Sequence, residues 1–222
     1  MSKSAIAFIF DLDGVLVSTS LHHYKAWQQI AHQLGIAIDE TFNEQLKGVS
    51  RKESLEVILS AGEIEMDNEL KSFWIDQKNK LYLEYISDLN SNALLPGVRY
   101  FLEQCLQKGI PMAIASASQN AQLILSKTQI QSFFHAIIDG NAVTQSKPHP
   151  EVFLKAAQAL NTNPKDCIVF EDSKKGLLAA KSAGMYLVGI GESSQLQGAN
   201  LIFEGFQNIT PEMIIHQFQN RP

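Results

Sequence analysis

The hydrophobic residues of this chain gather in short runs. Longer stretches, in which apolar residues have helical spacing, separate these runs. The runs do not alternate with polar residues, which is typical of strands covered on both faces in a parallel sheet. Each run predicts one strand. The runs are Ile6–Phe10, Pro111–Ala115, Ala136–Ile138, Cys167–Phe170, Tyr186–Ile190 and Leu201–Phe203.

Apolar residues three and four positions apart fill the spaces between the later runs. One stripe consists of Val98, Phe101, Leu102, Cys105 and Leu106, and another of Val152, Phe153, Ala156, Ala157 and Leu160. Helices therefore alternate with strands from Leu95 onward. Together with the first strand, this order predicts a doubly wound, Rossmann-like α/β core with a parallel sheet.

The stretch 19–93 breaks this rhythm and contains only helical patterns. Its apolar stripes are Trp27, Ile30, Ala31 and Leu34, then Leu70, Phe73, Trp74 and Leu81. Thr41 with Glu44, and Ser50 with Glu53, have the spacing of capping boxes that begin helices. We therefore expect an all-helical cap domain over 19–93, inserted into a core domain formed by 1–18 and 94–222.

Composition restricts the partners of the protein. Of 222 residues 45% are hydrophobic and 18% charged, and the net charge of −5 argues against nucleic acid or an anionic membrane as a partner. The apolar run before Asp11 is too short for a signal peptide, and no segment has the length of a membrane span. Cys105 and Cys167 are expected to be buried thiols in a reducing cytoplasm.

The most distinctive local motif is Asp11-Leu12-Asp13-Gly14, at the end of the first predicted strand. Residues two apart in an extended chain point the same way, so Asp11 and Asp13 converge at the sheet edge where α/β proteins bind ligands. Two such carboxylates repel each other, and Mg²⁺ with its preference for oxygen ligands would relieve the repulsion.

Three further polar groups follow other predicted strands. Ser116 to Asn120 offer hydroxyls and backbone N–H groups at a helix start, Ser146-Lys147-Pro148 supplies a cation, and Glu171-Asp172-Ser173 supplies two carboxylates. Each feature alone has an ordinary explanation. Ser118 and Asp172 could each cap a helix, and Lys147 could be a solvated surface lysine. Their common position at strand ends favours phosphoryl transfer, with a carboxylate nucleophile, a metal, a lysine and a hydroxyl clamp.

In order and context these groups resemble the four motifs of the haloacid dehalogenase superfamily, over essentially the whole chain. The resemblance implies that Asp11 is the nucleophile, through an aspartyl-phosphate. Asp13 would be the general acid/base, and its backbone carbonyl would ligate Mg²⁺. An aspartate at that position favours a phosphatase or mutase over a dehalogenase or ATPase.

The same resemblance implies roles for the later motifs. Ser116 and Lys147 would hold the transferring phosphoryl group, and the Lys147–Pro148 peptide bond would be cis. Glu171 and Asp172 would complete the metal site, with Asp172 as the direct ligand.

The helical insert resembles one branch of that superfamily nearly residue for residue. The matching segments are His23-x-x-x-Trp27, Asn43–Arg51 and Ser116-Ala117-Ser118. Members of this branch interconvert β-D-glucose 1-phosphate and glucose 6-phosphate through β-glucose 1,6-bisphosphate, which also serves as primer. The resemblance implies a cytoplasmic role in sugar catabolism, and a monomer is the default expectation.

The resemblance to this branch implies further site residues. Arg51, Ser118 and Asn120 would grip the distal phosphate, His23 would position Asp13 and the sugar hydroxyl, and Lys78 would contact the hexose. Trp27 and Ala117 would lie beside the substrate, with Trp27 mostly in the core. Without the resemblance, Arg51 and Lys78 would be read as solvated charges and His23 as a surface histidine.

Two positions depart from the branch pattern. Ser18 stands in the hinge where an aspartate is usual, and Gln119 stands where a lysine is common near the distal phosphate. Two alternatives also remain open from the sequence. One is a phosphatase of the same fold that hydrolyses a small sugar phosphate, and the other is a catalytically silent binding protein, against which intact Asp11 and Asp13 argue.

Overall fold

The computed structural model describes residues 6–221. Its sheet is parallel, with strand order β3-β2-β1-β4-β5-β6. The strands are β1 (Ala7–Phe10), β2 (Met112–Ala115), β3 (Ala136–Ile138), β4 (Cys167–Glu171), β5 (Tyr186–Ile190) and β6 (Leu201–Phe203). All the predicted strands are confirmed, with ends that differ by one residue at most.

Helices cover both faces of this sheet. The helices α5 (Val98–Gln107), α6 (Ala121–Lys127) and α9 (Pro211–Gln219) pack on one face, and α7 (Glu151–Ala159) and α8 (Lys174–Ser182) on the other. Successive side chains of β1 point to opposite faces of the sheet. Phe8 and Phe10 belong to the buried cluster on one face, and Ala7 and Ile9 belong to the cluster on the other. This double coverage explains the absence of alternation in the strand sequences.

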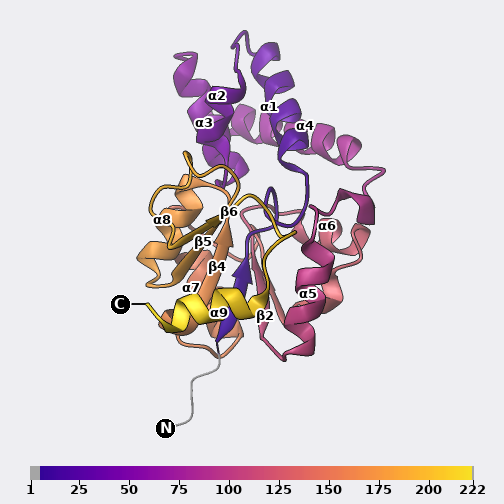
Figure 1. Ribbon diagram of the computed structural model, residues 1–222. Helices are drawn as coiled ribbons and strands as arrows, with labels where there is room; N and C mark the ends of the chain where they lie inside the picture. Colours follow the sequence, from indigo (N-terminus) through magenta and orange to yellow (C-terminus); the bar gives the residue numbers. More distant parts are fainter. Residues whose placement is uncertain (1–5, 222) are drawn as a thin grey trace.

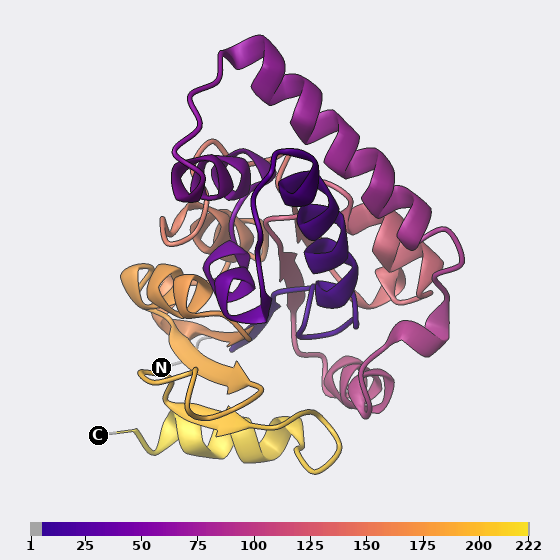
Figure 2. The ribbon, with the colours of Figure 1, turned by 90° about the horizontal axis from the view of Figure 1, so that it is seen from above.

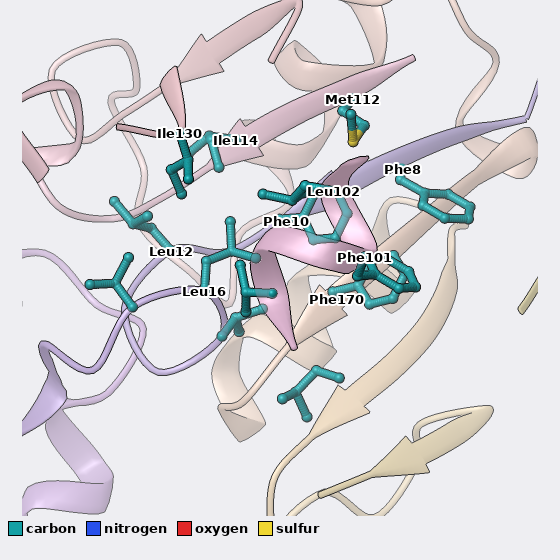
Figure 3. Packing of buried hydrophobic residues seen from close by; sticks show 14 of the residues in the cluster. Phe8, Phe10, Leu12, Leu16, Phe101, Leu102, Met112, Ile114, Ile130 and Phe170 are labelled. Atoms are coloured by element: carbon teal, nitrogen blue, oxygen red, sulfur yellow. The ribbon is translucent and has the colours of Figure 1, made fainter. Parts of the chain in front are cut away.

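Aromatic rings dominate the first of these clusters. Phe10 stacks on Phe170 with ring centroids 4.6 Å apart, and Phe101 of α5 packs against Phe8, Phe10 and Phe170 (Figure 3). The cluster thereby connects the two strands, β1 and β4, that end at the acidic motifs. Cys105 and Cys167 are buried and unpaired, as expected.

The segment between Ser20 and Tyr85 forms a separate helical layer above the carboxyl ends of the strands (Figures 1 and 2). It consists of α1 (Ser20–Gln33), α2 (Glu40–Asn43), η1 (Glu44–Leu46), α3 (Arg51–Ala61) and α4 (Asn68–Tyr85). Short 3₁₀ turns elsewhere are η2 (Ser91–Ala93), η3 (Gln131–Phe133) and η4 (Pro164–Asp166). The helical layer has a hydrophobic cluster of its own, which includes Trp27, Ile30, Leu55 and Ile58.

The two chain crossings between the layers lie side by side. Ser18 N donates to Ala93 O at 2.9 Å, and Leu95 N donates to Leu16 O at 2.9 Å. Val17 and Leu94 also form an isolated antiparallel bridge. Ser18, predicted from the sequence to lie in a hinge, is part of this short paired segment.

Of the two predicted helix starts, the one at Ser50 is confirmed. Ser50 accepts a hydrogen bond from Glu53 N at 3.3 Å and begins α3. The box predicted at Thr41 is wrong, because Asp39 takes the extended cap conformation and accepts from Phe42 N at 2.7 Å. Thr41 therefore already lies inside the first turn of α2.

The long helix α4 is present, but its buried face differs from the apolar stripe that marks it in the sequence. Leu70 and Phe73 are each 50% exposed, whereas Lys78 and Tyr82 are buried. The amino-terminal half of this helix contacts α3, where Lys71 Nζ pairs with Glu56 at 2.9 Å. The other half turns a cation and an aromatic ring toward the interior.

The aromatic cluster generates a stability prediction. We expect Phe101→Ala to lower the free energy of unfolding by about 3–5 kcal/mol, because it leaves a cavity among four other phenylalanine rings. Tyr100→Ala, in the same helix but 66% exposed, is the control and should change it by less than about 0.5 kcal/mol. Urea unfolding measures both values, and equal losses would contradict the assignment of this core.

Candidate functional site

The acidic motifs meet where the strand order reverses. β1 has β2 on one side and β4 on the other, so Asp11, Ser116 and Asp172 all follow strands at this switch point. Gly14 makes the approach possible. It has φ 88°, and a Cβ there would overlap the Asp172 carboxylate.

Lys147 connects two of the carboxylates. Its Nζ donates to Asp11 Oδ1 at 2.5 Å and to Glu171 Oε1 at 2.6 Å, and all three side chains are buried. The second oxygen of Glu171 accepts from Ser173 N at 2.8 Å and from Ser173 Oγ at 2.9 Å. The Lys147–Pro148 peptide bond is cis, as the resemblance predicts.

One lysine does not compensate all the negative charge. Burial, Glu171 and Asp13 raise the pKa of Asp11 to about 7, although Lys147 lowers it. Burial and the charges of Glu171 and Asp11 raise the pKa of Asp172 well above its usual value. Lys147 stays protonated, since both carboxylates raise its pKa despite its burial.

This excess of buried negative charge fits a divalent cation. Asp11 and Asp172 both line the cavity, and Mg²⁺ commonly takes only one or two carboxylates and completes its shell with water. No cage of three or more Asp, Glu, His or Cys side chains is found among residues 6–221. Glu171 has both oxygens engaged by Lys147 and Ser173, which favours Asp172 over Glu171 as the direct ligand.

The ordinary explanation of Asp172 as a helix cap is wrong. Ser173 caps α8, because its Oγ accepts from Gly176 N at 3.0 Å. The Asp172 carboxylate therefore does not serve as the cap.

A series of polar contacts, separate from the ion pairs of Lys147, begins at Asp13 and continues into the helical layer. Asp13 Oδ1 accepts a short hydrogen bond from Thr19 Oγ1 and lies 3.4 Å from His23 Nε2. The other ring nitrogen, His23 Nδ1, lies 2.7 Å from Lys78 Nζ. Lys78 Nζ in turn lies over the rings of Trp27 and Tyr82, at 5.1 and 4.9 Å from their centroids.

Burial changes the proton affinities along this series of contacts. Burial and Lys78 lower the pKa of His23 to about 4, and burial and Arg51 lower the pKa of Lys78 to about 7. Burial alone would raise the pKa of Asp13, but His23 and Thr19 lower it below its usual value. Neutral His23 can accept from Lys78 through Nδ1 and donate to ionised Asp13 through Nε2–H.

A cavity of about 70 Å³ lies between the helical layer and the sheet. Most of the predicted site residues line it, and Lys147 reaches it through its contact with Asp11. The lining includes Asp11, Asp13, His23, Trp27, Arg51, Lys78, Ser116, Ala117, Ser118 and Asp172.

Asn120, like Lys147 and Glu171, is a predicted residue that does not line this cavity. Its Nδ2 donates instead to Oδ1 of Asn79 on α4 at 3.0 Å, a contact that joins α4 to the start of α6. Gln119 lines an adjoining chamber with Ser50 and Lys147.

Several residues around the cavity were missed from the sequence. Ser20 and Ser54 line it, Thr19 and Tyr82 contact residues that do, and Asn79 accepts from Asn120 at the rim. Ser54 shares a helix face with Ser50, one turn before it, and a helical projection from the cap would have found it. The contacts of Tyr82 and Asn79 depend on how the two layers meet, for which the sequence carries no local signal.

These features define the class of protein. Residues 8–190 match the haloacid dehalogenase-like hydrolase family, so the chain belongs to it and is an enzyme of that superfamily. No helix among the described residues is both long and apolar enough to cross a membrane.

Within the family, the similarity extends over nearly the whole chain for one group of relatives. The chain is 41% identical over 215 residues to β-phosphoglucomutase of Bacillus subtilis, covering 96% of this chain and 95% of that protein. The crystal structure of β-phosphoglucomutase from Clostridium difficile matches with a TM-score of 0.93 at 40% identity, over 97% of each chain. A phosphorylated carbohydrates phosphatase of Thermotoga maritima is more distant, at 32% identity over 81% of this chain and 82% of that protein.

The depressed pKa of Lys78 generates a second prediction. Unfolded lysine keeps its proton to about pH 10.5, while folded Lys78 loses it near pH 7, so the wild-type protein gains stability as pH rises between these values. We expect Lys78→Met to raise the free energy of unfolding by a few kcal/mol below about pH 7, since one pKa unit is worth about 1.4 kcal/mol. The gain should vanish toward pH 10.5.

Urea unfolding across this pH range measures the effect. Lys80→Met, on the exposed face of the same helix, is the matched control and should show little change at any pH. A Lys78→Met variant whose stability differs from wild type by the same amount at all pH values would contradict the depressed pKa.

Proposed function

We propose that the protein is a β-phosphoglucomutase, which interconverts β-D-glucose 1-phosphate and glucose 6-phosphate. One observation carries the proposal: Arg51 and Ser118 line the same cavity as Asp11 and Asp13. A mutase must hold two phosphates at once, one beside the nucleophile and one away from it. Here Arg51 and Ser118 would hold the distal phosphate, and Ser116 and Lys147 the transferring one.

In the first half-reaction, phospho-Asp11 gives its phosphoryl group to the free 6-hydroxyl of β-glucose 1-phosphate. Ionised Asp13 removes the hydroxyl proton as the new O–P bond forms and the Asp11–phosphoryl bond breaks. The product is β-glucose 1,6-bisphosphate, beside an unmodified Asp11. The same bisphosphate would act as primer for an enzyme that has lost its phosphoryl group.

In the second half-reaction the bisphosphate has turned over, so that its 1-phosphate faces Asp11. The Asp11 carboxylate attacks that phosphorus, and the C1 oxygen leaves with the proton that Asp13 carried. Glucose 6-phosphate forms and phospho-Asp11 is restored. His23 and Lys78 orient Asp13 through the series of polar contacts, and Trp27, Ala117 and Lys78 contact the sugar.

Asp11, Asp172 and the backbone carbonyl of Asp13 would hold Mg²⁺. The ion would neutralise charge on the transferring phosphoryl oxygens. The raised pKa values of Asp11 and Asp172 support this site.

Catalysis would require the cap to move. The cavity of about 70 Å³ is far below the roughly 300–1,000 Å³ usual for ligand pockets, so substrate cannot enter the closed form. We assign 19–93 to a cap domain that opens about the crossings near Val17 and Leu94 and then closes to exclude water. The enzyme is taken to act as a cytoplasmic monomer, and its two buried thiols suit that compartment.

A coupled assay tests the function. The protein is mixed with Mg²⁺, β-glucose 1-phosphate and a trace of bisphosphate, and glucose 6-phosphate and free phosphate are read in parallel. We expect glucose 6-phosphate without matching phosphate release, none from the α-anomer, and loss of activity when a chelator removes the metal. Phosphate release without glucose 6-phosphate would instead identify a phosphatase, the alternative that the Thermotoga maritima relative favours.

Replacing the nucleophile separates an enzyme from a silent binding protein. We expect Asp11→Asn to reduce turnover by at least about 10³-fold, because the amide cannot form an aspartyl-phosphate. The variant should fold, since it removes a buried negative charge and keeps the side-chain shape. Turnover that survives this change would rule out the mechanism.

The distal phosphate site generates a further prediction. Gln119 lies beside Ser118 but adds no charge, so Gln119→Lys should lower the KM for the bisphosphate by roughly threefold to tenfold through one charge-assisted contact. The gain should shrink as salt rises. Gln158→Lys, on an exposed position of α7, adds the same net charge and should leave the KM unchanged. An equal gain in both variants would show that only net charge matters.

A further inference from the structure

Tyr82 is a cap residue whose side chain belongs to the core. It lies on α4 and is 0% exposed. Its buried neighbours form the cluster that contains Leu12, Val15 and Leu16, from the loop that carries Asp11 and Asp13. The ring therefore joins the last cap helix to the loop of the catalytic carboxylates.

The face of this ring packs against His23. The two ring centroids are 4.0 Å apart and the planes are inclined by 21°. The same ring has Lys78 Nζ above it at 4.9 Å, while Trp27 approaches Nζ at 5.1 Å. Tyr82 thus contacts both partners of the hydrogen bond between His23 Nδ1 and Lys78 Nζ.

This arrangement restricts how the imidazole can rotate. A flip of the His23 ring would put Cδ2 in the place of Nδ1 and Cε1 in the place of Nε2, so that neither Lys78 nor Asp13 would face a ring nitrogen. A stacked ring on one face and a lysine ammonium held at Nδ1 both oppose that flip. Nε2–H therefore remains directed at Asp13.

We propose that Tyr82 is a positioning residue, whose aromatic ring holds His23 in the Nε2–H tautomer and thereby orients Asp13 for proton transfer. The inference rests on the proposed function and adds to it a residue that does not line the cavity. It concerns the ring rather than the hydroxyl. The Tyr82 hydroxyl makes no hydrogen bond of regular geometry among the described residues, although the Thr19 side chain lies close enough to lower its pKa. Phenylalanine would supply the same stacking surface.

Two substitutions separate the ring from the hydroxyl. Tyr82→Leu removes the stacking surface, and we expect kcat to fall by about 10–100-fold, the scale of a misplaced catalytic group, with KM nearly unchanged. Tyr82→Phe should restore kcat to within about twofold of wild type. Both are measured on the full-length protein with Mg²⁺.

The ¹⁵N chemical shifts of the His23 ring report the tautomer independently of turnover. We expect a single Nε2–H form in the wild-type protein and in Tyr82→Phe, and a mixture of tautomers in Tyr82→Leu. Tyr186→Leu is the matched control, because Tyr186 is a similarly buried tyrosine that packs on Phe218. It should lose stability without a change in kcat or in the His23 shifts.

The outcomes distinguish the inference from the proposed function. The positioning role is overturned if Tyr82→Leu keeps both kcat and a single tautomer, or if Tyr82→Phe is as impaired as Tyr82→Leu. If the wild-type protein forms no glucose 6-phosphate but the His23 shifts respond as expected, the positioning role stands and the mutase assignment fails.

Discussion

The ion pair network of Lys147 with Asp11 and Glu171 is the interaction on which the rest of the site depends. Each buried carboxylate would be costly alone, and a partner lost from such a network leaves an uncompensated charge in the interior. Glu171 also receives two hydrogen bonds from Ser173, so the network extends to the start of α8. The position of Asp11, the proposed nucleophile, is therefore set at once by β1, β4, the loop that carries Lys147 and the start of α8.

The parallel sheet makes this network possible. Because β1 lies between β2 and β4, residues distant in the sequence end at one edge of the sheet. The aromatic cluster beneath them, with Phe10 stacked on Phe170, keeps the two acidic strand ends in register. A site that must place a nucleophile accurately benefits from rigid strands below it rather than from loops alone.

In the proposed reaction the cap completes the site, and it contacts the core in a different way. Polar contacts join it to the core, including Asn120 with Asn79, Lys127 Nζ with Ser87 O at 2.6 Å, and Lys175 Nζ with Gln45 O at 2.8 Å. Individually weak hydrogen bonds of this kind can be broken and remade, as an opening cap requires. Tyr82 differs from them because its ring is fully buried in the core cluster near the hinge. Its place there couples the position of the cap to the orientation of Asp13.

The sequence by itself determined the strands, their burial on both faces, and the carboxylates and lysine at their ends, because these depend on local patterns of apolar residues and on the parallel order of the strands. It also indicated Arg51, His23 and Lys78, but only through resemblance, since each is an ordinary surface residue by local pattern. Only the tertiary structure decided that Asp39 rather than Thr41 caps α2 and that Asn120 turns to Asn79. It also decided that both carboxylate oxygens of Glu171 accept hydrogen bonds, one from Lys147 and one from Ser173, and that Tyr82 stacks on His23. These contacts join residues whose distance is set by how the two layers pack, and no periodicity along the chain records that packing.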